Sequence, residues 1–298
     1  MRHFLELDDL SRDELADVLD RAEQPDLSPA LRGKGVALYF AKPSLRTRHS
    51  CEMAIVQLGG HPVTMKRDEI DPGARETWSD IANVLAGYHA VMGARVFDHE
   101  DVEALAAPNA LPVVNLLSDG SHPCQALADL LTMRQQLGPL AGLTVCYVGD
   151  YNNVGRSLAL GAAMTGMSVR LACPPGFGPS DVDLDRLAAL GGVPFVTTQP
   201  DEAAKDANAV HTDVWTSMGF EAESEHRSRA FEGFQVDDRV MDAADPHAIF
   251  MHCLPVHRGE EAAASVVDGS HSRIFEQAHN RMHSFRGLLS WLVEVNEQ

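Results

Sequence analysis

The chain has 298 residues, of which 45% are hydrophobic and 22% are charged, and its formal net charge is -19 at pH 7. This length and apolar content predict a globular protein of about two domains. The acidic balance argues against general affinity for nucleic acid or anionic membranes, because such binding draws its energy from clustered Lys and Arg. We therefore expect neither kind of partner, and any anionic ligand must be bound by a local group of cations.

Cysteine usage and the opening stretch bear on the compartment of the protein. The five cysteines are an odd number and form no CxxC pair, which fits reduced thiols better than a disulfide framework or a zinc site. No stretch approaches the roughly 18 apolar residues of a membrane span. Residues 1–15 are typical of an acidic amphipathic helix rather than a signal peptide. We expect a cytoplasmic protein.

Short apolar stretches alternate with helical patterns along the chain. This alternation predicts an α/β protein of two domains, each a parallel sheet with helices on both faces. Gly and Pro interrupt the pattern at 138–143, so we place the first domain at 1–137 and the second at 138–278. The closing amphipathic helix, 279–298, is predicted to complete the first domain. The predicted strands are 35–40, 61–65, 89–96 and 111–116, then 143–150, 168–174, 193–198, 207–214 and 247–254.

Polar clusters follow six of these predicted strands. In open parallel sheets, ligands bind beyond the carboxyl ends of the strands. One such placement carries little weight, but six together predict an active site in the cleft between the two domains. The clusters are "PSLRTR", Arg95, "SDGSHPCQ", "GDYNN", "DVWTSMG" and "HCLPVHRGEE".

Cations and hydroxyls are concentrated in "FAKPSLRTRHS", residues 40–50. After Phe40 the chain is predicted to turn through Pro43 into a helix whose first turn carries Ser44, Thr47 and two arginines. Helix N–H groups, hydroxyls and guanidinium groups then converge, which is the chemistry of an anion site. A basic helix start exposed to solvent is the alternative, and this stretch alone does not decide between them.

Other polar residues are ambiguous by themselves. His122 and Gln125 lie three apart at the start of a predicted helix, where a histidine is more often a cap or a surface residue than a catalyst. Cys253 fits an inert buried thiol as well as a functional one, and Asp213 fits a helix cap. The stretch "GDYNN" lacks the GxGxxG pattern of a dinucleotide site.

Together, several of these stretches resemble a known family. "KPSLRTR", Arg95 in "ARVF", "HPCQALADLLT", "DVWTSMG" and "HCLPVHRGEE" occur in the order and spacing of the aspartate/ornithine transcarbamylases, and the likeness extends to "HNR" at 279–281. S-x-R-T-R and HPxQ mark the family in general, whereas DxxxSMG and HCLP point to ornithine as acceptor. The resemblance implies transfer of the carbamoyl group of carbamoyl phosphate to the δ-amine of L-ornithine, giving L-citrulline and phosphate in arginine metabolism.

The resemblance also implies which residues act. Arg46, Arg95 and His122 would stabilise the charge that develops on the carbamoyl oxygen, with Cys253 beside the attacking amine. The reaction needs no metal or organic cofactor, and family members assemble as trimers or multiples of trimers. Carbamoyl phosphate would be bound by Ser44, Leu45, Arg46, Thr47, Arg95, His122, Gln125, Cys253, Leu254 and Arg281, and ornithine by Asn153, Asp213, Ser217 and Met218.

Two positions depart from the pattern of the family. Leu45 stands where a threonine is common, which removes one hydroxyl and keeps a backbone N–H. Asp71 stands in a loop, 67–80, where the family often carries a glutamine that reaches the site of a neighbouring subunit. An acid near a phosphate would be repulsive, so either this loop points away or affinity is lower. In the family a cis bond commonly precedes the proline of HCLP, here between Leu254 and Pro255.

Alternatives stay open for the function of the protein and for the origin of its net negative charge. A transcarbamylase with a different amine acceptor, such as N-acetylated ornithine, is disfavoured by the SMG element. A catalytically weak regulatory relative is disfavoured because nearly every polar position of the motifs is filled. The 43 acidic against 24 basic residues fit either adaptation to high salt or a codon bias that favours Arg over Lys.

Overall fold

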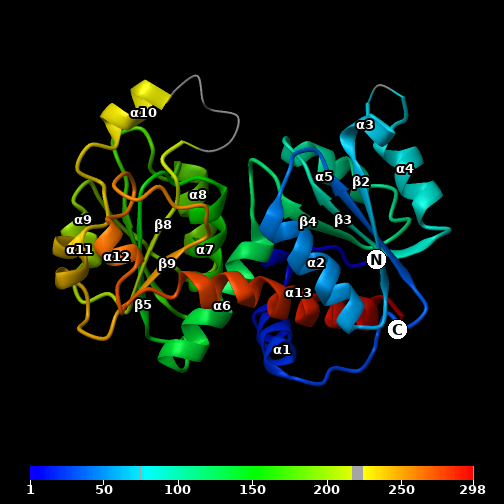
Figure 1. Ribbon diagram of the computed structural model, residues 1–298, viewed down its shortest axis with the longest axis horizontal. Coiled ribbons are helices and arrows are strands. Elements are labelled where there is room, and N and C mark those ends of the chain that lie inside the picture. Colours follow the sequence, from blue (N-terminus) through cyan, green and yellow to red (C-terminus); the bar gives the residue numbers. More distant parts are fainter. Residues whose placement is uncertain (74, 217–223, 298) are drawn as a thin grey trace. The chain divides into compact units, whose positions relative to one another are not determined.

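The computed structural model describes residues 1–73, 75–216 and 224–297 (Figure 1). The chain divides into two compact units, unit 1 formed by Met1–Leu131 with His279–Gln298 and unit 2 formed by Thr132–Ala278. Each unit contains one parallel sheet with helices, so the predicted α/β class is confirmed. The division falls inside helix α6 (Pro123–Leu137), and the domain boundary after residue 137 stays a prediction.

Unit 1 is built on a four-stranded parallel sheet in the order β2-β1-β3-β4. The central strand β1 is buried from Val36 to Phe40, which explains its continuous apolar sequence. The edge strand β2 is exposed at His61, Val63 and Lys66 and is correspondingly more polar. The four strands are β1 (Gly35–Phe40), β2 (His61–Lys66), β3 (His89–Arg95) and β4 (Val113–Leu117).

The opening stretch of unit 1 differs from the predicted helix. Helix α1 begins only at Arg12, because Ser11 and Glu14 form a capping box that starts the helix there. Before it, Phe4 pairs with β4, donating its N–H to the Val113 carbonyl and accepting from the Asn115 N–H, both at 2.8 Å. A short 3-10 turn, η1 (Leu7–Asp9), lies between. The helices are α1 (Arg12–Glu23), α2 (Leu45–Gln57), α3 (Arg67–Ile70), α4 (Trp78–Leu85) and α5 (His99–Ala106).

The closing helix α13 (Ile274–Glu297) begins before the predicted 279 and packs against α1. Gly287 makes this close approach possible, since a Cβ there would lie 2.5 Å from the Val18 carbonyl oxygen. Arg286 lies beside it and donates to the carbonyl of Gln24 just beyond the end of α1. These contacts join the two ends of the chain within unit 1.

Unit 2 is built on a five-stranded parallel sheet in the order β7-β6-β5-β8-β9. All nine strands predicted from the sequence are present in the two sheets. The five here are β5 (Thr144–Val148), β6 (Ser168–Ala172), β7 (Phe195–Thr197), β8 (Ala209–Thr212) and β9 (Ile249–His252).

An apolar core centred on Phe231, Phe250 and Val210 covers one part of this sheet. Small residues such as Ala203 and Ala204 let a short helix approach the strands closely within that core. The helices of unit 2 are α7 (Asn153–Met164), α8 (Asp181–Ala189), α9 (Pro200–Ala204), α10 (Ser224–Ala230), α11 (Asp238–Ala243) and α12 (Ala264–Val267).

Candidate functional site

Strand order reverses at one point in each sheet. In unit 1 the reversal lies between β1 and β3, because β2 is on the far side of β1 and β4 on the far side of β3. In unit 2 it lies between β5 and β8. Ligands of open parallel sheets bind at the carboxyl ends of the strands at such points. Each unit therefore has its own candidate ligand-binding region, which we call a half-site, where the sequence motifs follow those strands.

The first half-site includes the N-terminus of α2. Ser44 is the N-cap, and its hydroxyl accepts the N–H of Thr47 at 3.3 Å. The first turn carries no acidic residue, so the positive field of the helix end is available to an anion. Arg46 lies in this turn and is half-buried, whereas the side chain of Leu45 is 70% exposed. Leu45 thus offers a ligand its backbone N–H rather than a side-chain group.

Four segments far apart in the sequence meet in one buried polar cluster in unit 1. Arg281 on α13 donates to the Gln125 side-chain oxygen and contacts His122 Nε2 at 3.3 Å. It also donates to Thr47 Oγ1 at 3.2 Å, and Arg95 donates to the same hydroxyl oxygen at 3.3 Å. All five side chains are buried. The structure therefore brings together five of the ten residues that the sequence assigns to carbamoyl phosphate.

The amide nitrogen of Gln125 fixes the orientation of its side chain. Its Nε2 donates to Asp129 Oδ1 at 2.7 Å, one helical turn further along α6. Because the amide nitrogen is thereby used, the amide oxygen points toward Arg281. A second buried residue thus fixes the acceptor end of the Gln125 side chain.

His122 is held as a neutral imidazole. Burial, followed by the nearby charges of Arg281, Arg95 and Lys42, lowers the pKa of its ring well below the usual value. A guanidinium group only donates, so Nε2 accepts from Arg281 and the ring proton lies on Nδ1. His122 can therefore exchange hydrogen bonds with a ligand without adding a further positive charge.

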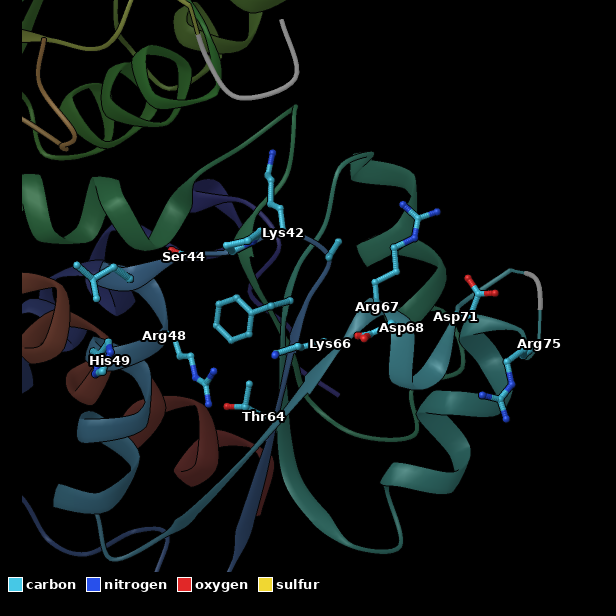
Figure 2. A pocket seen from close by; sticks show the side chains of 14 residues that line it. Lys42, Ser44, Arg48, His49, Thr64, Lys66, Arg67, Asp68, Asp71 and Arg75 are labelled. Atoms are coloured by element: carbon cyan, nitrogen blue, oxygen red, sulfur yellow. The ribbon is translucent and has the colours of Figure 1, made fainter. Parts of the chain in front are cut away.

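A pocket of about 900 Å³ opens beside the N-terminus of α2 (Figure 2). Lys42 and Ser44 lie at one end of it, whereas Asp71 and Arg75 lie at the other. Asp71 is thus in the same pocket as the anion site but at its far end, which limits the repulsion expected from its carboxylate. The other basic side chains that line it are Arg48, His49, Lys66 and Arg67.

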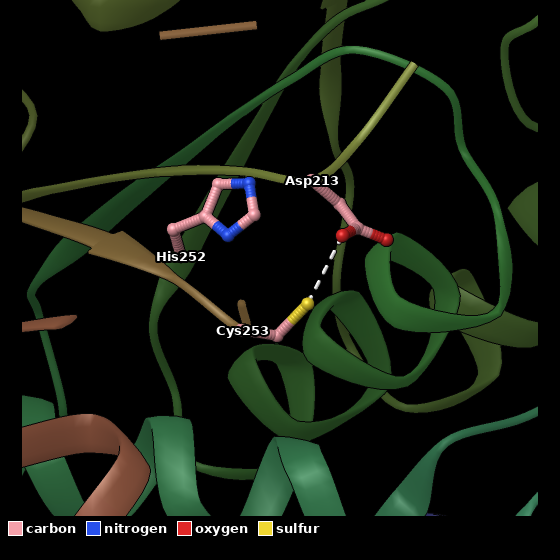
Figure 3. Close-up of side chains that lie close together, drawn as sticks. All are labelled: Asp213, His252 and Cys253. Atoms are coloured by element: carbon pink, nitrogen blue, oxygen red, sulfur yellow. Dashed lines mark hydrogen bonds between the residues drawn. The ribbon is translucent and has the colours of Figure 1, made fainter. Parts of the chain in front are cut away.

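The second half-site is centred on Asp213, just after β8 in unit 2. Cys253 Sγ donates to Asp213 Oδ1 at 3.0 Å, as Figure 3 shows. Asn152 Nδ2 donates to the other carboxylate oxygen at 2.9 Å, while its own side-chain oxygen caps α7 by accepting from the Val154 and Gly155 N–H groups. Two side chains from neighbouring strand ends therefore hold the carboxylate in one orientation.

The loop after β9 has an unusual backbone. Leu254 has a φ of 61°, a left-handed conformation rare for a branched side chain, and the predicted cis bond to Pro255 is confirmed. The Leu254 N–H donates to His252 Nδ1 at 2.8 Å, and His252 Nε2 faces Glu261 Oε1 at 3.2 Å, with both side chains fully buried. This buried pair supports the conformation of Leu254.

The structure describes some of the residues predicted to bind ornithine and not others. Asn153 is the first residue of α7, but the neighbouring Asn152 is the one that contacts Asp213. Ser217 and Met218 lie outside the described residues. Sequence reasoning missed Asn152, although an asparagine directly before a helical pattern is a capping signal.

Arg227 was also missed by sequence reasoning. This buried arginine on α10 pairs with Asp150, donates to the Trp215 carbonyl and stacks on the rings of Phe177 and Phe231. It thereby connects the loop after β5 with the segment after β8. No local pattern could have found it, because its partners are distant in the sequence.

Two clusters of the described residues have the donor types of a metal site: Asp213, His252 and Cys253, and His257, Glu260 and Glu261. In the first, His252 already faces Leu254 and Glu261 through its two nitrogens, as described above. Figure 3 accordingly shows only Cys253 directed to Asp213. The prediction that the protein needs no metal stays a prediction.

The described part of the chain contains no helix that is both long enough and apolar enough to cross a membrane.

Comparison with known proteins identifies the class to which both half-sites belong. Residues 2–135 match the family model described as aspartate/ornithine carbamoyltransferase, carbamoyl-P binding domain. Residues 141–292 match the one described as aspartate/ornithine carbamoyltransferase, Asp/Orn binding domain. The chain belongs to the aspartate/ornithine carbamoyltransferase family.

Individual relatives narrow this class. The ornithine carbamoyltransferase of Acidothermus cellulolyticus is 46% identical, over 99% of this chain and 97% of that protein. The solved structure of ornithine carbamoyltransferase from Pyrococcus furiosus superposes with a TM-score of 0.93 at 40% identity, covering 98% of this chain and 97% of that one. An N-acetyl-L-ornithine transcarbamylase also superposes, with a TM-score of 0.88 at 30% identity over 98% of this chain and 100% of that one.

Proposed function

We propose that this protein transfers the carbamoyl group of carbamoyl phosphate to the δ-amine of L-ornithine, releasing L-citrulline and phosphate. The observation that carries this proposal is the buried cluster of Thr47, Arg95, His122, Gln125 and Arg281 at the reversal point of the unit 1 sheet. Relatives that are ornithine carbamoyltransferases over nearly their whole length support the same conclusion.

Carbamoyl phosphate would bind with its phosphate at the N-terminus of α2. Ser44, the backbone of Leu45, Arg46 and Thr47 would supply the hydrogen bonds and the charge for this dianion. The carbamoyl group would then lie against the buried cluster, where Arg95 and His122 can donate to its oxygen and the Gln125 oxygen can accept from its amide. Arg281 would link these groups to the last helix, as its contacts in the unliganded cluster already do.

Ornithine would bind in the second half-site. Asp213 is oriented to accept hydrogen bonds from an ammonium group, since Asn152 and Cys253 hold its carboxylate. We assign the α-ammonium to Asp213 and the α-carboxylate to Ser217 and Met218, with Asn153 nearby. Cys253 and the Leu254 carbonyl would lie beside the δ-amine and the carbamoyl nitrogen. The contact of Cys253 and Leu254 with carbamoyl phosphate, and the cleft that would unite the half-sites, stay predictions.

The chemistry follows from these positions. The neutral δ-amine forms a bond to the carbamoyl carbon, and the carbonyl oxygen takes the negative charge. Arg46, Arg95 and His122 would donate to that oxygen, and preorganised donors of this kind are typically the largest contribution of an enzyme to such a step. The bond to the phosphate oxygen then breaks, the phosphate leaves with the electron pair, and the amine loses a proton. Cations around the site favour the uncharged amine that this attack requires.

A different acceptor amine is the second candidate. The likeness to an N-acetyl-L-ornithine transcarbamylase means that the fold by itself does not select the acceptor. The carboxylate of Asp213 is the feature that favours ornithine, because a free ammonium can pair with it and an acetylated amine cannot.

We further propose that the protein is a cytoplasmic homo-oligomer, a trimer or a multiple of trimers. Unit 1 exposes several large apolar side chains on and near α2 and α4, which is the usual composition of a subunit interface. They are Met53, Val56, Val63, Val84 and Tyr88. Light scattering of the active protein would test this, and a fully active monomer would contradict it.

An assay for citrulline from carbamoyl phosphate and ornithine tests the proposed function. We expect activity in the unchanged protein and a loss of about 10²–10³-fold in kcat/KM for Arg46→Ala, the usual effect of removing one oxyanion donor. Arg32→Ala is the matched control, because this exposed arginine lies in unit 1 away from the motifs. Full activity in Arg46→Ala would remove the α2 cluster from the mechanism.

A further inference from the structure

The turn that precedes His122 is tied to the start of helix α5, which is not part of any substrate motif. Residues 118–121 form a tight turn in which the Ser118 N–H donates to the Ser121 carbonyl at 2.9 Å. The Ser118 hydroxyl oxygen accepts from the Ser121 N–H at 3.2 Å and from Asn115 Nδ2 at 3.0 Å. The next residue is His122, which directly precedes α6. The geometry of this turn therefore sets the direction in which the His122 side chain leaves the backbone.

His99, at the start of α5, holds this turn on two sides. Its ring nitrogen Nδ1 lies 2.7 Å from Ser118 Oγ, the shortest contact that this hydroxyl makes. Its backbone N–H donates to Asp119 Oδ1 at 2.8 Å, and the Asp119 N–H donates to the Phe97 carbonyl at the same distance. Both the side chain and the backbone of His99 thus contact the turn.

Counting hydrogens assigns the direction of the His99–Ser118 bond. A serine hydroxyl has two lone pairs and one proton. The lone pairs receive hydrogens from the Ser121 N–H and Asn115 Nδ2, and two acceptors lie within reach of the proton. His99 Nδ1, at 2.7 Å from Oγ, is closer than the Ser121 carbonyl oxygen at 3.3 Å, so we assign the proton to His99 Nδ1. Nδ1 is then the acceptor, and the ring carries its own proton on Nε2. This agrees with the position of Glu6 Oε1, which lies 3.7 Å from Nε2.

We infer that His99 is a positioning residue for carbamoyl transfer: it accepts the Ser118 hydroxyl proton on Nδ1 and so fixes the turn that aims His122. This inference rests on the proposed function, in which His122 donates to the carbamoyl oxygen. Donors in a reacting site must be held to within a fraction of an ångström, so a loosened turn misplaces His122 while the rest of the cluster persists. The effect should therefore appear in kcat rather than in ornithine binding, which belongs to unit 2.

Three substitutions at one position separate this role from a general structural one. Asn and His both carry a polar atom at the δ position, so the oxygen of His99→Asn can accept from Ser118. The polar atoms of His99→Gln lie one bond further out, where Nε2 was, and His99→Ala has none. We expect kcat to fall about tenfold or more in His99→Ala and His99→Gln, the cost of leaving a buried hydroxyl proton without its acceptor, and His99→Asn to stay within about threefold of the unchanged protein.

His3 supplies the matched control. Its ring also contacts β4, accepting the Val113 N–H at 3.1 Å, but at the end of the strand remote from the turn. His3→Ala should lower the melting temperature without changing kcat. The double variant His99→Ala with Ser118→Ala should be no slower than the slower single variant, because both changes remove the same bond.

The experiment measures citrulline formation by the full chain, with kcat, the KM of each substrate and the melting temperature of every variant. If the unchanged protein makes no citrulline, the proposed function fails. If it is active, the inference alone is overturned by any of three results: an unchanged kcat in His99→Ala, equal rescue by Gln and Asn, or an independent effect of the two changes in the double variant.

Discussion

The protonation of His122 is set by its surroundings, and this makes its contribution to stability depend on pH. Its pKa is lowered in the folded state by burial and then by three cations, whereas in the unfolded chain it returns to about 6.5. Below that pH the unfolded state binds the extra proton, so stability falls with decreasing pH. The contribution of the neutral His122 to the free energy of unfolding is fully present above about pH 6.5. It is lost as the pH falls from there to the lowered pKa of the folded state.

We predict that acidification lowers the melting temperature of the unchanged protein more than that of His122→Gln, because the amide cannot take up the proton. Thermal unfolding at several values between about pH 5 and pH 8 measures the difference, since the ordinary histidine pKa lies inside this window. A difference that is constant across this range would contradict the account of a neutral His122.

Asp213 provides a second prediction for a single residue. Asp213→Asn keeps the shape of the side chain and removes the charge that we assign to the α-ammonium of ornithine. We expect kcat/KM for ornithine to fall about a hundredfold, because a buried ammonium would lose its charged partner, while the KM of carbamoyl phosphate changes little. Asp268→Asn is the control, since this exposed aspartate forms an ion pair with Arg258 on the surface of unit 2. Equal damage to the use of both substrates would show that Asp213 acts structurally.

The packing of α1 against α13 is the element on which the closure of unit 1 depends. A methyl group at Gly287 would lie 2.5 Å from the Val18 carbonyl oxygen and 2.7 Å from the Ala22 nitrogen, both in the backbone of α1. Backbone cannot yield as a flexible side chain does, so we predict that Gly287→Ala lowers the free energy of unfolding by about 1–3 kcal/mol. Urea denaturation of both proteins measures this change in the free energy of unfolding.

Gly178→Ala is the matched control for this packing. Among the described residues, the nearest atom to a Cβ there would be Cys173 Cβ, at an ordinary 3.8 Å. It should change the free energy of unfolding by less than about 0.5 kcal/mol, as surface substitutions usually do. Equal stability of the two variants would mean that the helices are not in the close contact described.

At the level of elements, the sequence predicts the strands better than the ends of the helices. Buried parallel strands such as β1 are continuous apolar stretches, and this signal is local. The opening helix was misplaced because Phe4 pairs with β4, a contact more than a hundred residues away in the sequence. The start of α13 was placed too late because its first residues, 274–278, belong to unit 2, where Ile274 packs in the core, and lie outside the amphipathic stretch at 279–298.

In the candidate site, too, local sequence motifs predict the residues that act, whereas the residues that support them from distant parts of the chain carry no local signal. Motifs predict that Thr47, Arg95, His122, Gln125 and Arg281 act together, and the structure places them in one cluster. The supports of that cluster were not predicted. Asp129 orients Gln125 and His99 holds the turn before His122, but neither has a signature apart from the fold.

The charge of the whole molecule leads to a prediction about salt. With 43 acidic and 24 basic residues, self-repulsion opposes the folded state. Raising the salt concentration to about 1 M shortens the screening length to about 3 Å, so the melting temperature should rise. Calorimetry over a series of NaCl concentrations measures this. A flat response would leave codon bias as the explanation of the composition.

The choice of acceptor tests the central claim most directly. The measurement is kcat/KM for L-ornithine, N-acetyl-L-ornithine and L-lysine, each with saturating carbamoyl phosphate. We assign the free α-ammonium of the acceptor to the carboxylate of Asp213, so one additional methylene would displace the reacting amine from the carbamoyl carbon and should cost at least about tenfold. We predict that ornithine is the best substrate, that lysine is used at least about tenfold less well, and that N-acetylornithine is hardly used. Equal or faster turnover of N-acetylornithine would contradict the assignment of ornithine, although carbamoyl transfer itself would stand.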